Sequence, residues 1–166
     1  MILVDANLLI YAIDRDSPHH KIAHKWVESA FSGSTTVGLS WGVILAFLRL
    51  TTRPGILSHP MSTEDALGFV DEWIHLEVVE VIVPGERHWP VFRNLLKAAG
   101  AAGNLTSDAH LAALAIERGA AVYSADNDFA RFPGLHHVNP LVKPGRARGS
   151  PRGADGSSDK GESLLG

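Results

Sequence analysis

The sequence predicts an α/β domain whose central sheet is largely parallel. Short apolar runs, which suit strands buried on both faces, alternate along the chain with amphipathic stretches of helical period. The chain has 166 residues, of which 45% are hydrophobic and 20% charged, as in one ordinary globular domain. The composition changes after Leu141, so we expect a folded domain over 1–141 and a disordered Gly/Ser/Arg-rich tail over 142–166.

The first elements are a strand and two helices. The apolar run at 1–4 predicts a buried strand, and residues 7–12 predict a short helix directly after it. Ser17 precedes a proline, which is typical of a helix start, and predicts a helix over 18–31. We expect its buried face to consist of Ile22, Ala23, Trp26, Val27 and Ala30.

The middle of the chain repeats this pattern. A strand over 35–39 leads into a helix over 41–52, which Ser40 can cap. Acidic residues in a first turn favour a helix over 62–76, because negative charge suits the positive end of the helix dipole. The run at 78–83 predicts the next strand.

The last third of the domain offers two helices and two strands. A helix over 87–99 comes first, and Thr106 is expected to cap an alanine-rich helix over 107–118. Residues 120–124 predict a strand, and Val138 belongs to a last short one. Strands interleaved with helices in this way are typical of a parallel sheet.

Acidic side chains stand where ligands bind in such sheets. Asp5 and Asp126 follow predicted strands, and Asp108 lies in the first turn of a helix. Two carboxylates about 4 Å apart repel by roughly 4 kcal/mol at an effective dielectric constant of 20. A hard divalent cation would relieve this repulsion, since Mg²⁺ and Mn²⁺ prefer oxygen ligands. Each acid alone also fits an ordinary role as a cap or turn former.

Several other classes receive little support from the sequence. The absence of cysteine excludes disulfides, thiolate metal sites and cysteine nucleophiles. Phosphate-binding glycine loops and a nucleophile elbow around Ser40 are also missing. His20 and His24 lack the glutamate of a His-Glu-x-x-His zinc motif, and His110 is expected to have a packing or surface role. Neither a signal peptide nor a membrane-spanning run is visible, so we expect a cytoplasmic protein.

Three strings of the sequence resemble those of the PIN-domain ribonucleases, and most closely the VapC-type toxins of toxin–antitoxin pairs. They are Val-Asp-Ala-Asn at 4–7, Asn-Leu-Thr-Ser-Asp-Ala-His-Leu-Ala-Ala-Leu-Ala at 104–115, and Ser-Ala-Asp-Asn-Asp-Phe at 124–129. Their order and spacing fit the family over residues 1–141. Together they are specific, whereas Asp-x-Asn alone is a weak signal.

The resemblance implies a three-layer α/β/α PIN-like fold with a mostly parallel central sheet. It implies hydrolysis of RNA phosphodiester bonds with Mg²⁺ or Mn²⁺ as cofactor, a small cognate antitoxin as partner, and a homodimer as an assembly common in the family. The implied catalytic residues are Asp5, Asp108, Asp126 and Asp128, of which the first three would bind the metal ion. Asn7 and Ser124 match polar positions that support the acids through hydrogen bonds.

One position departs from the family pattern. The usual glutamate on the helix after the second strand would fall at Ala46, and Gly42, one turn earlier, is not acidic either. Arg49 and Arg53 could share a helix face with Ala46 and contact the RNA phosphate, or simply be solvated. The alternative to an enzyme is therefore a weak or inactive PIN-like module that binds RNA or an antitoxin. A third reading is an unrelated α/β domain with scattered acids.

Overall fold

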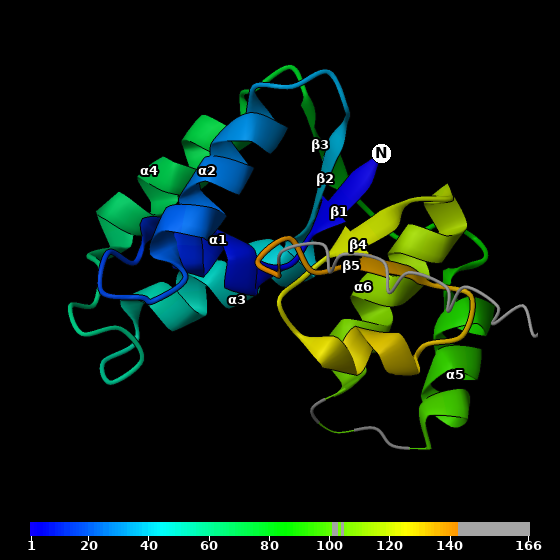
Figure 1. The fold of residues 1–166 in the computed structure, drawn as a ribbon. Helices are drawn as coiled ribbons and strands as arrows, with labels where there is room; N and C mark the ends of the chain where they lie inside the picture. Colours follow the sequence, from blue (N-terminus) through cyan, green and yellow to red (C-terminus); the bar gives the residue numbers. More distant parts are fainter. Residues whose placement is uncertain (101–102, 104, 143–166) are drawn as a thin grey trace, which may run out of the picture.

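The structure is a computed structural model that describes residues 1–100, 103 and 105–142, and in these residues it contains one five-stranded sheet. All neighbouring strands pair in parallel, in the order β3-β2-β1-β4-β5 (Figure 1). The strands are β1 (Ile2–Val4), β2 (Val37–Ser40), β3 (Val79–Ile82), β4 (Ala121–Tyr123) and β5 (His136–Val138). The predicted α/β class is thereby confirmed. The predicted tail falls almost entirely on 143–166, outside the described residues.

Helices cover both faces of the sheet, which gives three layers. Figure 1 shows α1, α2, α3 and α4 on one side and α5 and α6 on the other. Their bounds are α1 (Ala6–Ile13), α2 (His20–Phe31), α3 (Trp41–Thr52), α4 (Thr63–Ile74), α5 (His88–Ala99) and α6 (Leu105–Arg118), followed by the 3₁₀ helix η1 (Asn127–Arg131). In the described part of the chain, no helix has both the length and the apolar character needed to span a bilayer.

The core fills the spaces between the sheet and its two helical layers. Leu3 and Leu39 on the strands are fully buried, and Phe47 of α3 packs edge-on against Trp73 of α4 with ring centroids 4.8 Å apart. The prediction that Ile22 is buried is wrong, because its side chain is 48% exposed. The buried stripe of α2 follows the four-residue spacing of Ala23, Val27 and Phe31 instead.

Predicted caps hold for some helices only, since α2 begins at His20 after the N-cap residue His19 and not after the predicted Ser17. The buried Ser40 hydroxyl accepts the Val43 amide at 3.2 Å and begins α3, as expected. Thr106 is not the cap of α6, because the helix already begins at Leu105. Instead, the Thr106 amide donates to the Gly103 carbonyl at 3.1 Å, and Gly103 adopts a positive φ of 65°.

The topology defines one crevice. The chain moves from β1 through β2 to β3 in one direction and then crosses over to β4 and β5 on the other side of β1. The strand order therefore reverses between β1 and β4, which is where open parallel sheets bind their ligands. The Asp5 amide donates to the Tyr123 carbonyl at 3.0 Å, so the carboxyl ends of these two strands stay together.

Candidate active site

Two acidic side chains leave the sheet on either side of this reversal. Asp5 follows β1 and caps α1, and its Oδ1 accepts the Ala6 amide at 2.7 Å. Asp126 follows β4 and caps η1, and its Oδ1 accepts the Asp128 amide at 2.8 Å. Each carboxylate is thus oriented by a backbone N–H group at the start of a helical turn. The prediction that each of these acids follows a strand is confirmed, and the structure adds that the two strands are neighbours in the sheet.

Ser124 connects the two strand ends. Its side chain is fully buried, and its hydroxyl donates to Asp5 Oδ2 at 2.7 Å. The same oxygen accepts from Asn7 Nδ2 at 2.9 Å and from the Asp126 amide at 3.0 Å. Asn7 Oδ1 in turn accepts the Ala125 amide at 3.3 Å. Ser124 therefore contacts Asp5 and the backbone of Asp126, and Asn7 contacts Ser124. Their role in supporting the acids during function stays a prediction.

Asp108 reaches the same group from the first turn of α6. Burial raises the pKa of its carboxyl to about 6, and the negative charges of Asp5, Asp126 and Asp128 act in the same direction. Burial also raises the pKa of Asp5, against the opposing effect of its hydrogen bond from Ser124. The acids thus form one electrostatic group, in which ionisation of each member disfavours ionisation of the others.

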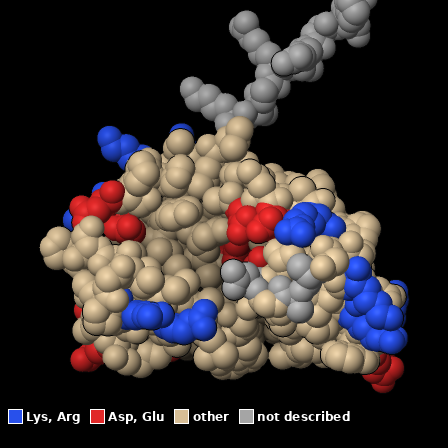
Figure 2. Space-filling model, turned by 90° about the horizontal axis from the view of Figure 1, so that it is seen from below, with Lys and Arg blue, Asp and Glu red and all other residues tan. Residues whose placement is uncertain are grey.

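The acids line two adjoining hollows. A cleft of about 320 Å³ is bordered by Asp5, Asp108 and residues of α3, α5 and α6. A more open hollow next to it is bordered by Asn7, Asp126 and Asp128. Figure 2 shows acidic side chains near the centre of the face seen from below, beside a depression and with basic side chains on either side. This face carries the carboxyl ends of the strands.

The donor set suits a hard divalent cation. Carboxylate oxygens are the ligands that Mg²⁺ and Mn²⁺ prefer, and a cation would offset the mutual repulsion of these acids. Within residues 1–100, 103 and 105–142, no three His, Asp or Glu side chains stand close enough to share one ion. An ion here would accordingly take one or two carboxylates together with water, which is common coordination for Mg²⁺.

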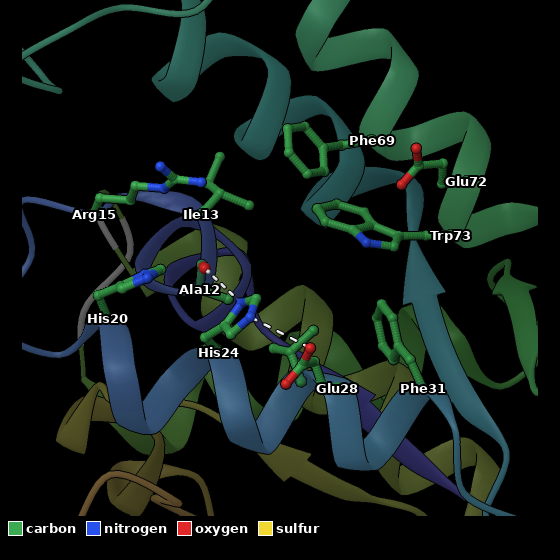
Figure 3. A pocket seen from close by; sticks show the side chains of 11 residues that line it. Ala12, Ile13, Arg15, His20, His24, Glu28, Phe31, Phe69, Glu72 and Trp73 are labelled. Carbon is green, nitrogen blue, oxygen red and sulfur yellow. Dashed lines mark hydrogen bonds and ion pairs between the residues drawn. The ribbon is translucent and has the colours of Figure 1, made fainter.

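Another hollow lies away from the acids. It measures about 460 Å³ and lies between α1, α2 and α4, with Phe31, Phe69 and Trp73 along its wall (Figure 3). His24 Nδ1 lies 3.2 Å from the Ala12 carbonyl and its Nε2 lies 3.4 Å from Glu28. These contacts occupy both ring nitrogens of His24. No acid from the strand ends lines this hollow, so it is not the candidate active site.

The two arginines proposed to contact phosphate do not line the cleft. Arg49 is exposed in the last turn of α3. Arg53 lies outside this helix with extended backbone angles, because the following Pro54 disfavours the helical conformation. The expected shared helix face is therefore wrong for Arg53, whereas Arg49 does lie on α3 three residues after Ala46. Contact of either arginine with RNA outside the cleft stays a prediction. Ala46 does line the cleft, as the resemblance implies for the usual glutamate position.

Gly42 also lines the cleft without filling it. A Cβ atom built at Gly42 would stand 3.5 Å from its nearest neighbour, His110 Cδ2, which is an ordinary contact distance. Glycine is therefore not required here by a close backbone approach. The cleft has room for a side chain at this position.

Sequence reasoning missed a polar chain that enters the cleft. His110 borders the cleft, and its Nδ1 lies 2.9 Å from Nε2 of His88, the first residue of α5. His88 Nδ1 lies 2.9 Å from Oε2 of Glu117. Burial and the neighbouring His88 lower the pKa of His110. His110 and Glu117 are seven residues apart on one face of α6, but His88 belongs to α5 and joins them only through the packing of α5 on α6.

Comparison with known proteins identifies the family to which this fold belongs. Residues 2–135 match the family model of the PIN domain. Ribonuclease VapC37 of Mycobacterium tuberculosis is 40% identical over 140 residues, covering 84% of this chain and 97% of that protein. Ribonuclease VapC33 of the same species is 40% identical over 141 residues, covering 85% of this chain and 99% of that protein.

Solved structures share the fold at low sequence identity. Mycobacterium tuberculosis VapC20, described as a sarcin-ricin loop cleaving toxin, has a TM-score of 0.63 at 20% identity, covering 87% of this chain and 100% of that one. VapBC2 from Rickettsia felis, bound to a promoter DNA fragment, has a TM-score of 0.60 at 21% identity, covering 84% and 98%. The reading as an unrelated α/β domain is wrong, because the family match spans nearly the whole described domain. The chain belongs to the PIN-domain family.

Proposed function

We propose that this chain is a metal-dependent endoribonuclease that acts as the toxin of a toxin–antitoxin pair. The carrying observation is the convergence of Asp5, Asp108 and Asp126 at the one point where the strand order reverses. The ribonuclease names of relatives about 40% identical support the same activity. Solved neighbours include VapBC2 from Rickettsia felis and VapBC from Salmonella typhimurium, which supports an antitoxin as the partner of this chain, and we further propose a homodimer.

One or two of the carboxylates of Asp5, Asp108 and Asp126, together with water, would hold Mg²⁺ or Mn²⁺, with Asp128 as a further acid at the rim. A bound ion of this kind lowers the pKa of a water ligand and stabilises negative charge on a phosphate oxygen. Ser124 and Asn7 fix the orientation of the carboxylates, so little rearrangement is needed when substrate arrives. The acids also repel the RNA backbone unless a cation is present, which ties substrate binding to the metal.

Cleavage of a mixed cellular RNA pool tests the proposal. Purified protein freed of any antitoxin should cut RNA with Mg²⁺ or Mn²⁺ and should stop in chelator. Asp5→Asn should abolish cleavage, because it removes a carboxylate charge from the site. Asp71→Asn, an exposed residue of α4, is the matched control and should cut normally.

The binding-only module predicts a different result. It retains RNA or antitoxin binding in a folded sample but shows no cleavage with either metal, and Asp5→Asn then leaves binding largely intact. That outcome would overturn the enzymatic proposal.

A further inference from the structure

A partly buried chain of three polar side chains, Glu117 and His110 from α6 and His88 from α5, runs into the cleft. Glu117 and His88 are 8% and 12% exposed, and each heavy-atom separation along Glu117–His88–His110 is 2.9 Å. The His88 ring stacks on Phe92 with centroids 6.0 Å apart, and Phe92 also borders the cleft. The chain therefore ends at the His110 ring, inside the same cleft as Asp5 and Asp108.

The surroundings hold Glu117 in place for this role. The Gly85 amide lies 3.4 Å from Glu117 Oε2 and donates to it. A Cβ atom at Gly85 would stand only 3.0 Å from Glu117 Oε1, so a glycine leaves room for the carboxylate. The far end of the chain is thus fixed by backbone as well as by His88.

With Glu117 ionised and both histidine rings neutral, the chain of contacts allows one order of donors and acceptors. An ionised Glu117 can only accept, so His88 donates through Nδ1–H and its neutral ring keeps a lone pair on Nε2. His110 must then donate its own Nδ1–H to His88. The Nε2 atom of a neutral His110 therefore carries a lone pair, on the edge of the ring that faces Gly42 and the cleft.

We propose that His110 Nε2 accepts a hydrogen bond from a ribose 2′-hydroxyl of RNA bound in the cleft, and that His88 and Glu117 are positioning residues that hold His110 as an acceptor. This inference rests on the proposed ribonuclease function. A phosphate oxygen offers no proton to such an acceptor, whereas the 2′-hydroxyl is a donor beside every phosphate of RNA and is absent from DNA. His110 would accordingly contribute to the choice of RNA over DNA.

Kinetics with altered substrates test the contact directly. The cleavage site would first be mapped in a cellular RNA pool, and oligoribonucleotides carrying it would then be made with single 2′-deoxy nucleotides beside the scissile bond. One such substitution should lower kcat/KM about tenfold for the wild type, the size expected for one neutral hydrogen bond. His110→Ala should show the same loss on all-ribose substrate and no further loss on the 2′-deoxy one.

The positioning residues require a second comparison. Glu117→Gln should lower kcat/KM less than His110→Ala does, and should have no additional effect in a His110→Ala background. Glu80→Gln is the matched control. Glu80 lies on β3 and forms an exposed ion pair with Arg118 of α6, the helix that also carries Glu117. The proposal would be overturned if the 2′-deoxy substitution lowered kcat/KM of His110→Ala as well. It would also be overturned if the effect of His110→Ala depended on the identity of the base and not on the 2′-hydroxyl.

An NMR experiment that does not depend on cleavage distinguishes failure of this inference from failure of the ribonuclease proposal. In the Asp5→Asn protein, ¹H–¹⁵N NMR of the histidine rings should show His110 protonated on Nδ1 and His88 also on Nδ1. A short single-stranded RNA of mixed sequence should shift the His110 Nε2 resonance, whereas DNA of the same sequence should not. An Nε2–H tautomer of His110, or equal responses to RNA and DNA, would refute the inference whether or not the protein cleaves.

Discussion

At the scale of single residues, Ser124 is the position on which the geometry of the acids depends most. We expect Ser124→Ala to lower the free energy of unfolding by about 1–3 kcal/mol, because Asn7 and Asp5 each lose a buried partner. Cleavage should fall roughly 10- to 100-fold, as is common when a group that orients metal ligands is removed. Thermal unfolding and initial cleavage rates measure the two effects.

Ser62→Ala separates lost stability from lost orientation. Ser62 caps α4, an exposed helix away from the cleft, and accepts the Asp65 amide at 3.0 Å. Its loss should cost about 1 kcal/mol of stability with little change in activity. Equal losses of activity in Ser62→Ala and Ser124→Ala would contradict an orienting role for Ser124.

The raised pKa of Asp108 predicts a pH dependence of stability. The Asp108 carboxyl binds its proton more tightly in the native state than an ordinary carboxyl of pKa 3.8 does. Protonation of Asp108 therefore adds to the free energy of unfolding at low pH, and this contribution is lost as the pH rises from about 4 to 6. In chelator, Asp108→Asn should therefore be more stable than the wild type above pH 7, by about 1–2 kcal/mol after allowance for solvent screening. The difference should vanish near pH 4.

Chemical denaturation at several pH values measures this difference. Asp71→Asn, which alters an exposed carboxylate, serves as the control. A constant gain for Asp108→Asn across the whole pH range would show that the carboxyl is not strained by burial and by its neighbours.

Sequence reasoning reached the acids but not the histidines, for a physical reason. Asp5 and Asp126 follow strand ends, so the topology rule alone brings them together. His88 and His110 lie on two separate helices, and their separation of 2.9 Å depends on how these helices pack. Helix packing is set by side-chain shape over the whole interface, which no local spacing records.

At the scale of elements, α3 decides how many acids the cleft holds. Ala46 lines the cleft from this helix, and we expect Ala46→Glu to destabilise the metal-free protein by adding a further like charge. Mg²⁺ should then raise Tm by roughly 2–4 °C more than in the wild type, equivalent to about 1 kcal/mol of extra binding. Thermal unfolding with and without Mg²⁺ provides the measurement.

Leu45→Glu is the matched control on the same helix. Leu45 is 60% exposed and does not border the cleft, so an added carboxylate there should give no metal-dependent gain. A similar Mg²⁺ response from both variants would mean that the ion binds away from the cleft.

The elements themselves were largely predictable. Alternating apolar runs and caps such as Ser40 located every strand and helix to within a few residues. The errors concern faces and ends, as at Ile22 and Thr106, where the orientation of one helix on another or a nearby backbone carbonyl decides the outcome. Arg53 differs, because the restriction that proline places on its predecessor can be read from the sequence.

At the scale of the whole molecule, charge limits how the protein can hold RNA. Residues 1–141 carry 10 Lys and Arg against 15 Asp and Glu, a balance of −5. Close to the acids, Arg131 already pairs with Asp128 at 3.7 Å and donates to the Ala99 carbonyl at 3.2 Å. Within residues 1–141, acids thus outnumber the cations that could release counterions from RNA.

We therefore expect a shallow dependence of RNA affinity on salt. With about four phosphate contacts or fewer, the slope of log K against log salt concentration should be no steeper than about −3 for single-stranded RNA. Titration of labelled RNA with Asp5→Asn protein in constant Mg²⁺ gives this slope. A slope on the order of −7 would point to a basic binding surface that these charges do not provide.

The hydrogen bond between Ser124 and Asp5 spans 119 positions of the chain. In chain order β1 leads into one half of the site, and β4, the fourth strand of the described sheet, leads into the other. A growing chain that ends before β4 has neither Ser124 nor Asp126 and cannot align Asp5. The parallel crossover thus makes the alignment of the acids depend on segments from opposite ends of the domain sequence.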